Sequence, residues 1–301
     1  MIPPAASVIV ALNPHEGDID RVTEAYRRQA GVEGGFELIV VDNGSRPALA
    51  RRPLDDAAEP RIRWIETSRP GRAAANNAGV RASASSTLIF VADDFIPAPT
   101  LVRAHVGFHR NLTADGVGIG PAFFTPECRD DPFRRWLEDS GRLFGVPFRT
   151  ASSRWPRDFL YLGNASMPRG LYEALGGFDE TFEHDLFDDL EFSLRLADRG
   201  VPTHLLTKAL AWHDHAVTLD ERLQAMHRSG AAARRYDEAR QGRRPWADLV
   251  DQPLESLSAR VGRGCEADAS AARRFDYFSA LVDLAFVRGY RGLAGGATAA
   301  R

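Results

Sequence analysis

Cysteine and lysine are both scarce in this chain of 301 residues. The two cysteines, Cys128 and Cys265, are too few for a disulfide framework and lack the close spacing of a metal-binding motif. Lys208 is the single lysine, so arginine carries almost all of the positive charge, a bias that we attribute first to codon usage. The net charge of -3 argues against a general nucleic-acid binder, which would carry a strong basic excess.

Long apolar runs are also missing. None approaches the roughly 18 residues that a membrane-spanning helix requires. No charged segment precedes the first apolar run, as it would in a signal peptide. The sequence therefore predicts a cytoplasmic protein without an integral membrane segment, and it leaves peripheral attachment to a membrane open. The apolar content of 44% is ordinary for a soluble globular chain.

Short apolar runs alternate with amphipathic segments in the first third of the chain, and this alternation predicts an α/β fold with a parallel sheet. The segments expected to form strands are 7–12, 36–41, 61–65 and 88–91, and those expected to form helices are 19–30 and 72–84. No GxGxxG sequence stands at any of the strand-to-helix turns, so the dinucleotide-binding fingerprint is missing.

The stretch 87–97, TLIFVADDFIP, is the most informative part of the sequence. An apolar run stops at Asp93 and Asp94, and we expect Pro97 to prevent the strand from continuing. Ligands of open α/β sheets bind outside the carboxyl ends of the strands. Two adjacent carboxylates at such an edge favour a hard divalent cation, Mg²⁺ or Mn²⁺, although a solvated turn is the alternative interpretation.

Further polar residues follow other predicted elements. Asp42 ends the second strand and is equally consistent with a turn or with a hydrogen bond to a nucleotide base or ribose. Asp188 and Asp189 begin a helix, where carboxylates are stabilised by the helix dipole whether or not they act in catalysis. His213 follows an expected strand at 205–212; such a histidine is usually structural but can complete a metal site.

The rest of the chain gives weaker signals. The expected elements are a helix at 101–111, a strand at 116–124 and a helix at 132–144. From Thr218 onward the sequence is helical, with a strongly amphipathic segment at 275–286. The apolar face of that segment suits packing on the rest of the chain, a homodimer or a membrane surface, and we favour packing.

Four motifs occur in order: SVIVALNP, ELIVVDNGS, the segment from RPGRAAANNAG to FVADDFIP, and the segment from GGFDETF to DLFDDLEFSLRLADRG, followed by AWHDH. Their order and spacing resemble those of a family 2 glycosyltransferase of the GT-A fold. The resemblance implies a nucleotide-binding βαβ (Rossmann-like), mainly parallel sheet fused to an acceptor-binding half. The implied catalytic domain is 1–215, divided into a nucleotide-sugar-binding half at 1–98 and an acceptor-binding half at 99–215, with a C-terminal helical extension at 216–301.

The resemblance assigns the donor nucleotide to the ends of the first strands. Asp42 takes the position of the acid that reads the base, and Ala11 and Leu12 fall on the base-binding wall. This wall departs from the family pattern, because ALNP replaces a string similar to Pro-Thr-Tyr-Asn. Arg72 is expected to add a positive contact for the donor.

The resemblance also aligns the acidic run with the DxD motif, which holds the donor diphosphate through a divalent metal. Its first position falls on Ala92, its middle position on Asp93 and its metal-binding last position on Asp94. Ala92 is a departure that puts the ribose contact in doubt, and Asp93 is the residue expected to compensate. His213 is expected to contact the metal or the diphosphate.

The family's Glu-Asp pair falls on Asp188 and Asp189, with Asp189 as the catalytic base. The implied reaction is inverting: Asp189 takes the proton of an acceptor hydroxyl, whose oxygen attacks the anomeric carbon opposite the leaving nucleoside diphosphate. The expected donor is a UDP- or dTDP-sugar, and the acceptor is a glycan, a lipid-linked molecule or a small molecule. Trp155, Tyr161 and Asn164 are candidates for the acceptor side.

Two other functions stay open. A sugar nucleotidyltransferase shares the general sheet and the need for metal, but no Gly-rich loop with Arg and Lys stands near the first strand. A catalytically inactive sugar-nucleotide-binding protein would explain Ala92. The presence of Asp94, Asp189 and His213 favours the transferase.

Overall fold

The computed structural model describes residues 3–12, 19–44, 60–142, 161–182, 187–239, 245–264 and 269–295. They form two compact units. The first consists of the described residues within 1–128, 140–184 and 188–215, and the second of those within 129–139, 185–187 and 216–301. The segment 129–139 therefore groups with the C-terminal helices.

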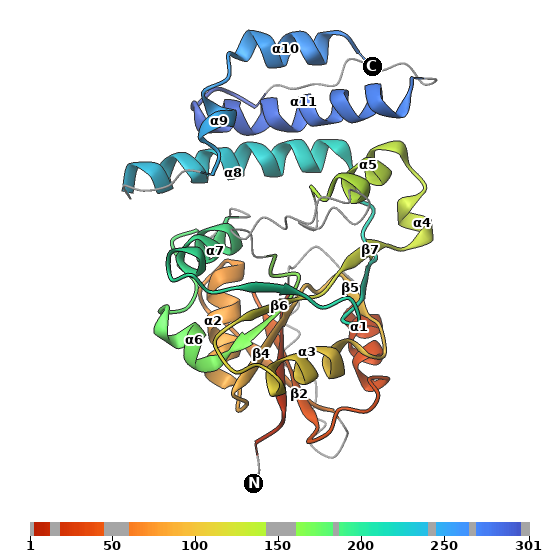
Figure 1. Cartoon of the computed structure of the whole chain (residues 1–301), viewed down its shortest axis with the longest axis vertical. Helices are drawn as coiled ribbons and strands as arrows, with labels where there is room; N and C mark the ends of the chain where they lie inside the picture. Colours follow the sequence, from red (N-terminus) through yellow and green to blue (C-terminus); the bar gives the residue numbers. More distant parts are fainter. Residues whose placement is uncertain are drawn as a thin grey trace. The chain divides into compact units, whose positions relative to one another are not determined.

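A seven-stranded sheet is the centre of the first unit (Figure 1). Its order is β3-β2-β1-β4-β8-β6-β9. The strands are β1 (Ala6–Ala11), β2 (Phe36–Asp42), β3 (Arg61–Glu66), β4 (Thr87–Val91), β6 (Val117–Ile119), β8 (Asn164–Pro168) and β9 (Thr203–Leu205). Only β8 runs antiparallel to its neighbours, β4 and β6. The predicted α/β fold with a mainly parallel sheet is confirmed.

Helices cover both faces of this sheet. They are α1 (Ile19–Arg27), α2 (Arg72–Ala82), α3 (Leu101–Arg110), α6 (Arg169–Ala174) and α7 (Asp188–Asp198). α2 lies very close to β1, because a Cβ atom added to Gly79 would lie 2.5 Å from the side chain of Ile9. Alternate residues of a strand point to opposite faces. Ala165 of β8 therefore belongs to the core on the α2 side, whereas Asn164 and Ser166 point toward α3.

A second sheet of three strands brings distant parts of the first unit together. It consists of β5 (Phe95–Pro97), β10 (Ala211–His213) and β7 (Ala122–Phe124), in that order. β10 pairs antiparallel with β5 and parallel with β7.

This small sheet corrects three expectations. The run expected to stop at Asp93 and Asp94 resumes as β5, an edge strand whose last residue is Pro97, where a missing N–H is tolerated. The single strand expected at 116–124 is two strands in different sheets, separated at Gly120 and Pro121. The strand expected at 205–212 is likewise divided, because a turn closed by the Ala209 N to Leu206 O hydrogen bond separates β9 from β10.

The second unit is helical. Its main elements are α5 (Pro132–Ser140, of which Ser140 groups with the first unit), α8 (Leu219–Ala239), α9 (Ala247–Val250), α10 (Leu254–Gly262) and α11 (Ala271–Tyr290), and the short α4 (Pro126–Arg129) ends at its border. α8 and α11 pack backbone to backbone, because a Cβ atom added to Gly230 would lie 2.0 Å from the Phe286 carbonyl oxygen. Within the part of the chain that the structure describes, no helix has the length and apolar character needed to cross a bilayer.

Candidate active site

Asp94 and His213 form the first of two charged centres in the first unit. Asp94 follows β4 in a turn in which the Phe95 N–H donates to the Ala92 carbonyl, and His213 ends β10. The pairing of β5 with β10 aligns His213 with Phe95, which brings the two side chains together. His213 Nε2 lies 2.8 Å from Asp94 Oδ2. We call this pair the DH pair.

The neighbours of Asp94 set its protonation. Burial alone would raise the pKa of its carboxyl, but the imidazoles of His213 and His215 act in the opposite direction and outweigh it, so the pKa of Asp94 is lowered. Asp93, the adjacent acid, is also buried. A carboxylate that stays ionised at low pH is suited to hold a cation.

Arg72, Asp188 and Asp189 form the second centre. Arg72 begins α2, and the two acids begin α7. The guanidinium binds Asp188 with both of its ends: Nε lies 3.1 Å from Oδ2, and Nη2 donates to Oδ1. Nη2 also lies 3.4 Å from Asp189 Oδ2. We call this group the RDD cluster.

The two acids of this cluster differ in their surroundings. Asp188 is almost completely buried against Arg72. Asp189 accepts one hydrogen bond from the Leu190 N–H at 2.8 Å and has only the longer approach to Arg72. Burial, with a contribution from the charge of Asp188 and against that of Arg72, raises the pKa of Asp189 to about 6. Both carboxylates in turn raise the pKa of Arg72 against the opposing effect of burial.

Two groups of hydrogen bonds hold α7 and α2 in place, and sequence reasoning missed both. Glu191 is fully buried and pairs with Arg195, whose guanidinium also donates to the Leu175 and Gly177 carbonyls. Asn77 of α2 accepts from the Phe178 N–H and donates to the Phe178 carbonyl, at 3.0 Å each. These contacts fix the turn before α7 to α2. The sequence signal was weak, a polar residue within each of two predicted helices.

The predicted donor-binding residues lie at the carboxyl ends of β1 and β2. Ala11 ends β1, and Leu12 extends its pairing by donating to the Val41 carbonyl at 2.9 Å. Asp42 ends β2 and is buried; its carbonyl accepts from the Thr67 N–H at 3.0 Å. The roles predicted for these residues, and the donor contact predicted for Arg72, stay predictions.

The three residues proposed for the acceptor side differ in where they lie. Tyr161 lies 6.0 Å from Phe95 between ring centroids, so it belongs to the surroundings of the DH pair, and its contact with an acceptor stays a prediction. Asn164 is fully buried and bonded to other parts of the fold, so its predicted contact with an acceptor is wrong. Trp155 lies outside the described residues.

A divalent cation fits the DH pair. Among the described residues, no group of three or more His, Cys, Asp or Glu side chains is arranged to hold a metal. Mg²⁺ sites that include substrate phosphates need only one or two protein carboxylates, and imidazole is a further ligand that Mn²⁺ accepts. Asp94 and His213 supply this smaller set.

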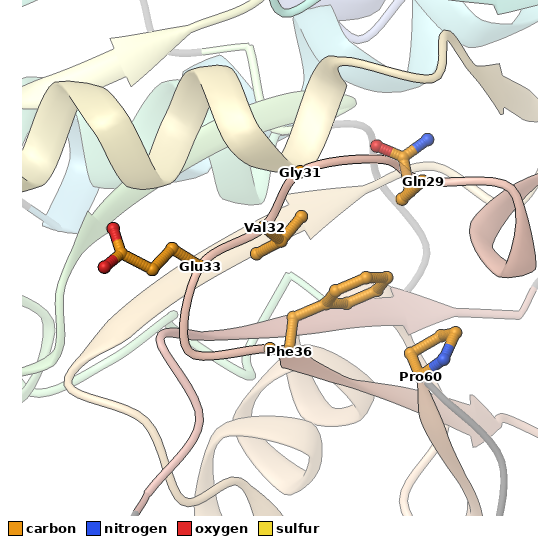
Figure 2. A pocket seen from close by; sticks show the side chains of 7 residues that line it. Gln29, Gly31, Val32, Glu33, Phe36 and Pro60 are labelled. Carbon is orange, nitrogen blue, oxygen red and sulfur yellow. The ribbon is translucent and has the colours of Figure 1, made fainter.

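A hollow of about 400 Å³ lies elsewhere in the first unit, at the connection between α1 and β2 (Figure 2). It is lined by Gln29, Gly31, Val32, Glu33, Gly35, Phe36 and Pro60. Phe36 begins β2 and Asp42 ends it, so the hollow lies at the amino end of this strand, away from Asp42. The Gln29 amide donates a hydrogen bond to the Ala98 carbonyl and accepts one from the Val102 N–H. We do not assign the active site here.

The model of glycosyl transferase family 2 matches residues 7–176, more than half of the chain. The chain belongs to this family. Two validoxylamine A glucosyltransferases, from Streptomyces hygroscopicus subsp. limoneus and subsp. jinggangensis (strain 5008), are each 24% identical to it over 227 residues, 66% of this chain. The match covers 49% and 53% of these relatives, so this family 2 chain spans about half of their length.

Solved structures show the same fold at low sequence identity. One is the mannosyltransferase PcManGT from Pyrobaculum calidifontis in complex with GDP-Man and Mn²⁺, with a TM-score of 0.58 at 17% identity. The match covers 96% of the chain described here and 87% of the mannosyltransferase chain. Residues 1-349 of S. aureus TarS give a TM-score of 0.56 at 14% identity, over 95% and 80% of the two chains. The GT-A fold and the family predicted for this chain are confirmed.

Proposed function

We propose that this protein is an inverting, divalent-metal-dependent glycosyltransferase that moves a sugar from a UDP- or dTDP-sugar to an acceptor hydroxyl, with Asp189 as the general base. One observation carries the proposal. A single compact unit contains two buried acidic centres at the ends of its strands and helices, and the pKa of Asp94 is lowered while that of Asp189 is raised to about 6. One centre is suited to a cation and the other to a proton.

The donor side depends on Asp94 and His213, which would hold Mg²⁺ or Mn²⁺. The metal supplies electrostatic stabilisation of the charge that grows on the departing diphosphate. Asp93 adds a carboxylate for the ribose in place of Ala92. Asp42, Ala11 and Leu12 bind the base, and Arg72 is a further contact for the donor. In this assignment residues 1–98 bind the nucleotide sugar.

The acceptor side depends on Asp189. A base with a pKa of about 6 is ionised at neutral pH and still accepts a proton readily as the acceptor oxygen attacks. Asp188 and Arg72 orient it, since Arg72 binds Asp188 with both ends and reaches Asp189 at 3.4 Å. The acceptor, whether a glycan, a lipid-linked molecule or a small molecule, binds within residues 99–215. The helices of 216–301 extend this catalytic domain.

Calorimetric titration of the full chain tests this proposal. UDP, dTDP and GDP are each titrated with and without Mn²⁺, into the wild-type protein, Asp94→Ala and the exposed control Asp198→Asn. We expect Mn²⁺-dependent binding of UDP or dTDP that Asp94→Ala loses and Asp198→Asn keeps. Preference for GDP would overturn the donor assignment. Failure of every nucleotide to bind would overturn the transferase proposal itself.

A further inference from the structure

Four buried or half-buried side chains form a continuous hydrogen-bonded chain between α3 and β8. His109 Nε2 lies 2.8 Å from Ser166 Oγ, which lies 2.7 Å from His105 Nδ1. His105 Nε2 lies 2.9 Å from Asn164 Oδ1. The histidines belong to α3 and the other two residues to β8. His105, Ser166 and Asn164 are fully buried, so solvent does not compete for these bonds.

The direction of each bond follows from Asn164. Its Nδ2 donates to the Ala209 carbonyl at 2.7 Å and to the Pro121 carbonyl at 3.4 Å, so Oδ1 is the acceptor for His105. His105 Nε2 therefore carries the hydrogen. Burial lowers the pKa of His105 to about 4, which keeps the ring neutral and makes Nδ1 an acceptor for the Ser166 hydroxyl.

Asn164 is the point where the two sheets of the first unit are joined. Its backbone pairs with Val91 at the end of β4, and the preceding Gly163 carbonyl accepts from the Ala92 N–H at 3.0 Å. Its side chain holds Ala209, two residues before β10 begins. β4 leads to Asp94, and β10 ends at His213. The Asn164 amide thus adds a side-chain link between the two segments that carry the DH pair, beside the pairing of β5 with β10 and the hydrogen bond from the Asp214 N–H to the Asp94 carbonyl.

The side-chain amide of Asn164 is tightly packed. A Cβ atom added to Gly120 would lie 2.1 Å from the Ala209 carbonyl oxygen and 2.2 Å from Asn164 Nδ2. An amide that rotates here has no other space to occupy without moving the backbone. The Ala209 and Pro121 carbonyls hold its nitrogen, and His105 Nε2 is the side-chain donor that holds its oxygen.

We propose that His105 is a positioning residue for the proposed metal site: its Nε2–H holds the oxygen of the Asn164 amide, whose nitrogen links β8 to the segment that leads into β10 and His213. The inference rests on the proposed function, in which the DH pair binds the metal. His105 does not touch the reacting groups and acts through Asn164.

Two variants of His105 separate this role from general stability. Glutamine places an amide nitrogen near the position of Nε2 and keeps the bond to Asn164, whereas asparagine places an oxygen near the position of Nδ1 and keeps only the bond to Ser166. Both variants lose one buried hydrogen bond, so their thermal unfolding is expected to fall by similar amounts. Comparison of the two therefore reports on Asn164 alone.

The first readout is Mn²⁺ binding to the full chain, followed by the electron paramagnetic resonance signal of free Mn²⁺. We expect His105→Gln to bind Mn²⁺ within about twofold of wild type and His105→Asn to bind about tenfold more weakly, the effect of one buried hydrogen bond. Equal losses in both variants, or no loss in either, would overturn the positioning role.

The second readout needs no metal. In ¹⁵N spectra of the imidazoles we expect His105 of the wild-type protein to be the neutral Nε2–H tautomer, and the His213 resonances to move in His105→Asn but not in His105→Gln. A Nδ1–H tautomer, or His213 shifts that are the same in both variants, would contradict the inference. If wild-type protein binds no Mn²⁺, the proposed function fails, and this readout still decides the role of His105.

Discussion

The DH pair and the RDD cluster each contain a carboxylate whose side chain is 12% exposed, Asp94 in one and Asp189 in the other. Their pKa values nevertheless move in opposite directions, down for Asp94 and up to about 6 for Asp189. Equal burial therefore does not set the protonation of these acids. The difference lies in the partners that each carboxylate has.

Asp94 has a partner of its own, since His213 Nε2 lies 2.8 Å from it. Asp189 shares its cation with a neighbour, because Arg72 makes its two closest bonds to Asp188. The uncompensated part of the burial cost raises the pKa of Asp189, and the negative charge of Asp188 adds to it. One fold thus gives two acids different protonation, as the proposed roles of Asp94 toward a metal and of Asp189 toward a proton require.

The largest effect that we expect is on catalysis by Asp189→Asn. The variant keeps the size of the side chain and removes the base, so kcat should fall by about 10²- to 10⁴-fold with little change in donor affinity. Transfer or donor hydrolysis is measured at pH 8, where wild-type Asp189 is ionised. Asp198→Asn, an exposed acid of the same helix, is the control and should keep wild-type kcat. Wild-type turnover by Asp189→Asn would contradict the assignment of the base.

Asp94→Ala should act on binding instead. We expect it to weaken Mn²⁺ binding by about 100-fold, because a ligand to the metal is lost. Titration of Mn²⁺ into the variant and into Asp189→Asn compares the two centres directly, and only Asp94→Ala should lose affinity. A similar loss in both variants would mean that the centres are not separate.

The pH dependence of kcat/KM should show an acid limb with a midpoint near 6, because only ionised Asp189 accepts a proton. Below the midpoint, kcat/KM should fall about tenfold per pH unit. Arg72→Gln removes the charge that lowers the pKa of Asp189, so its midpoint should move above that of wild type. A midpoint that stays in place, or moves to lower pH, would show that Arg72 does not act on Asp189.

The smallest effect concerns stability. A native pKa of about 6 means that folded Asp189 holds its proton more tightly than the unfolded chain does, so the free energy of unfolding falls as pH rises from about 4 to 6. Asparagine removes this loss. We expect Asp189→Asn to raise the free energy of unfolding at pH 7 by about 1–3 kcal/mol, measured by urea denaturation. A gain that persists unchanged at pH 3.5 would have another cause.

The parallel half of the sheet was predictable because its strands contain continuous apolar runs, such as LIVV in β2. β8 was not, since its sequence NASMP has no β-branched or aromatic residue. Its polar side chains, Asn164 and Ser166, are buried because α3 supplies histidine partners. The small sheet escaped prediction because its strands are three residues long and pair between distant segments.

The acids of the site were predictable because they follow the ends of predicted elements. Their partners were not. Arg72 and Asp188 are separated by 116 positions in the sequence. Only the folded chain shows that Arg72, which we expected to contact the donor, binds the acids of α7. His105 carried no signal at all, because histidines on an amphipathic helix do not reveal what they will face.

The most direct test of the contrast between the two acids is a ¹³C NMR titration of the aspartate carboxyl groups in the metal-free protein, with Asp94→Asn and Asp189→Asn used to assign the two resonances. The account predicts that Asp189 titrates near pH 6 and Asp94 below the ordinary range of an aspartate. Titration of both groups near pH 4, or Asp94 titrating above Asp189, would contradict it.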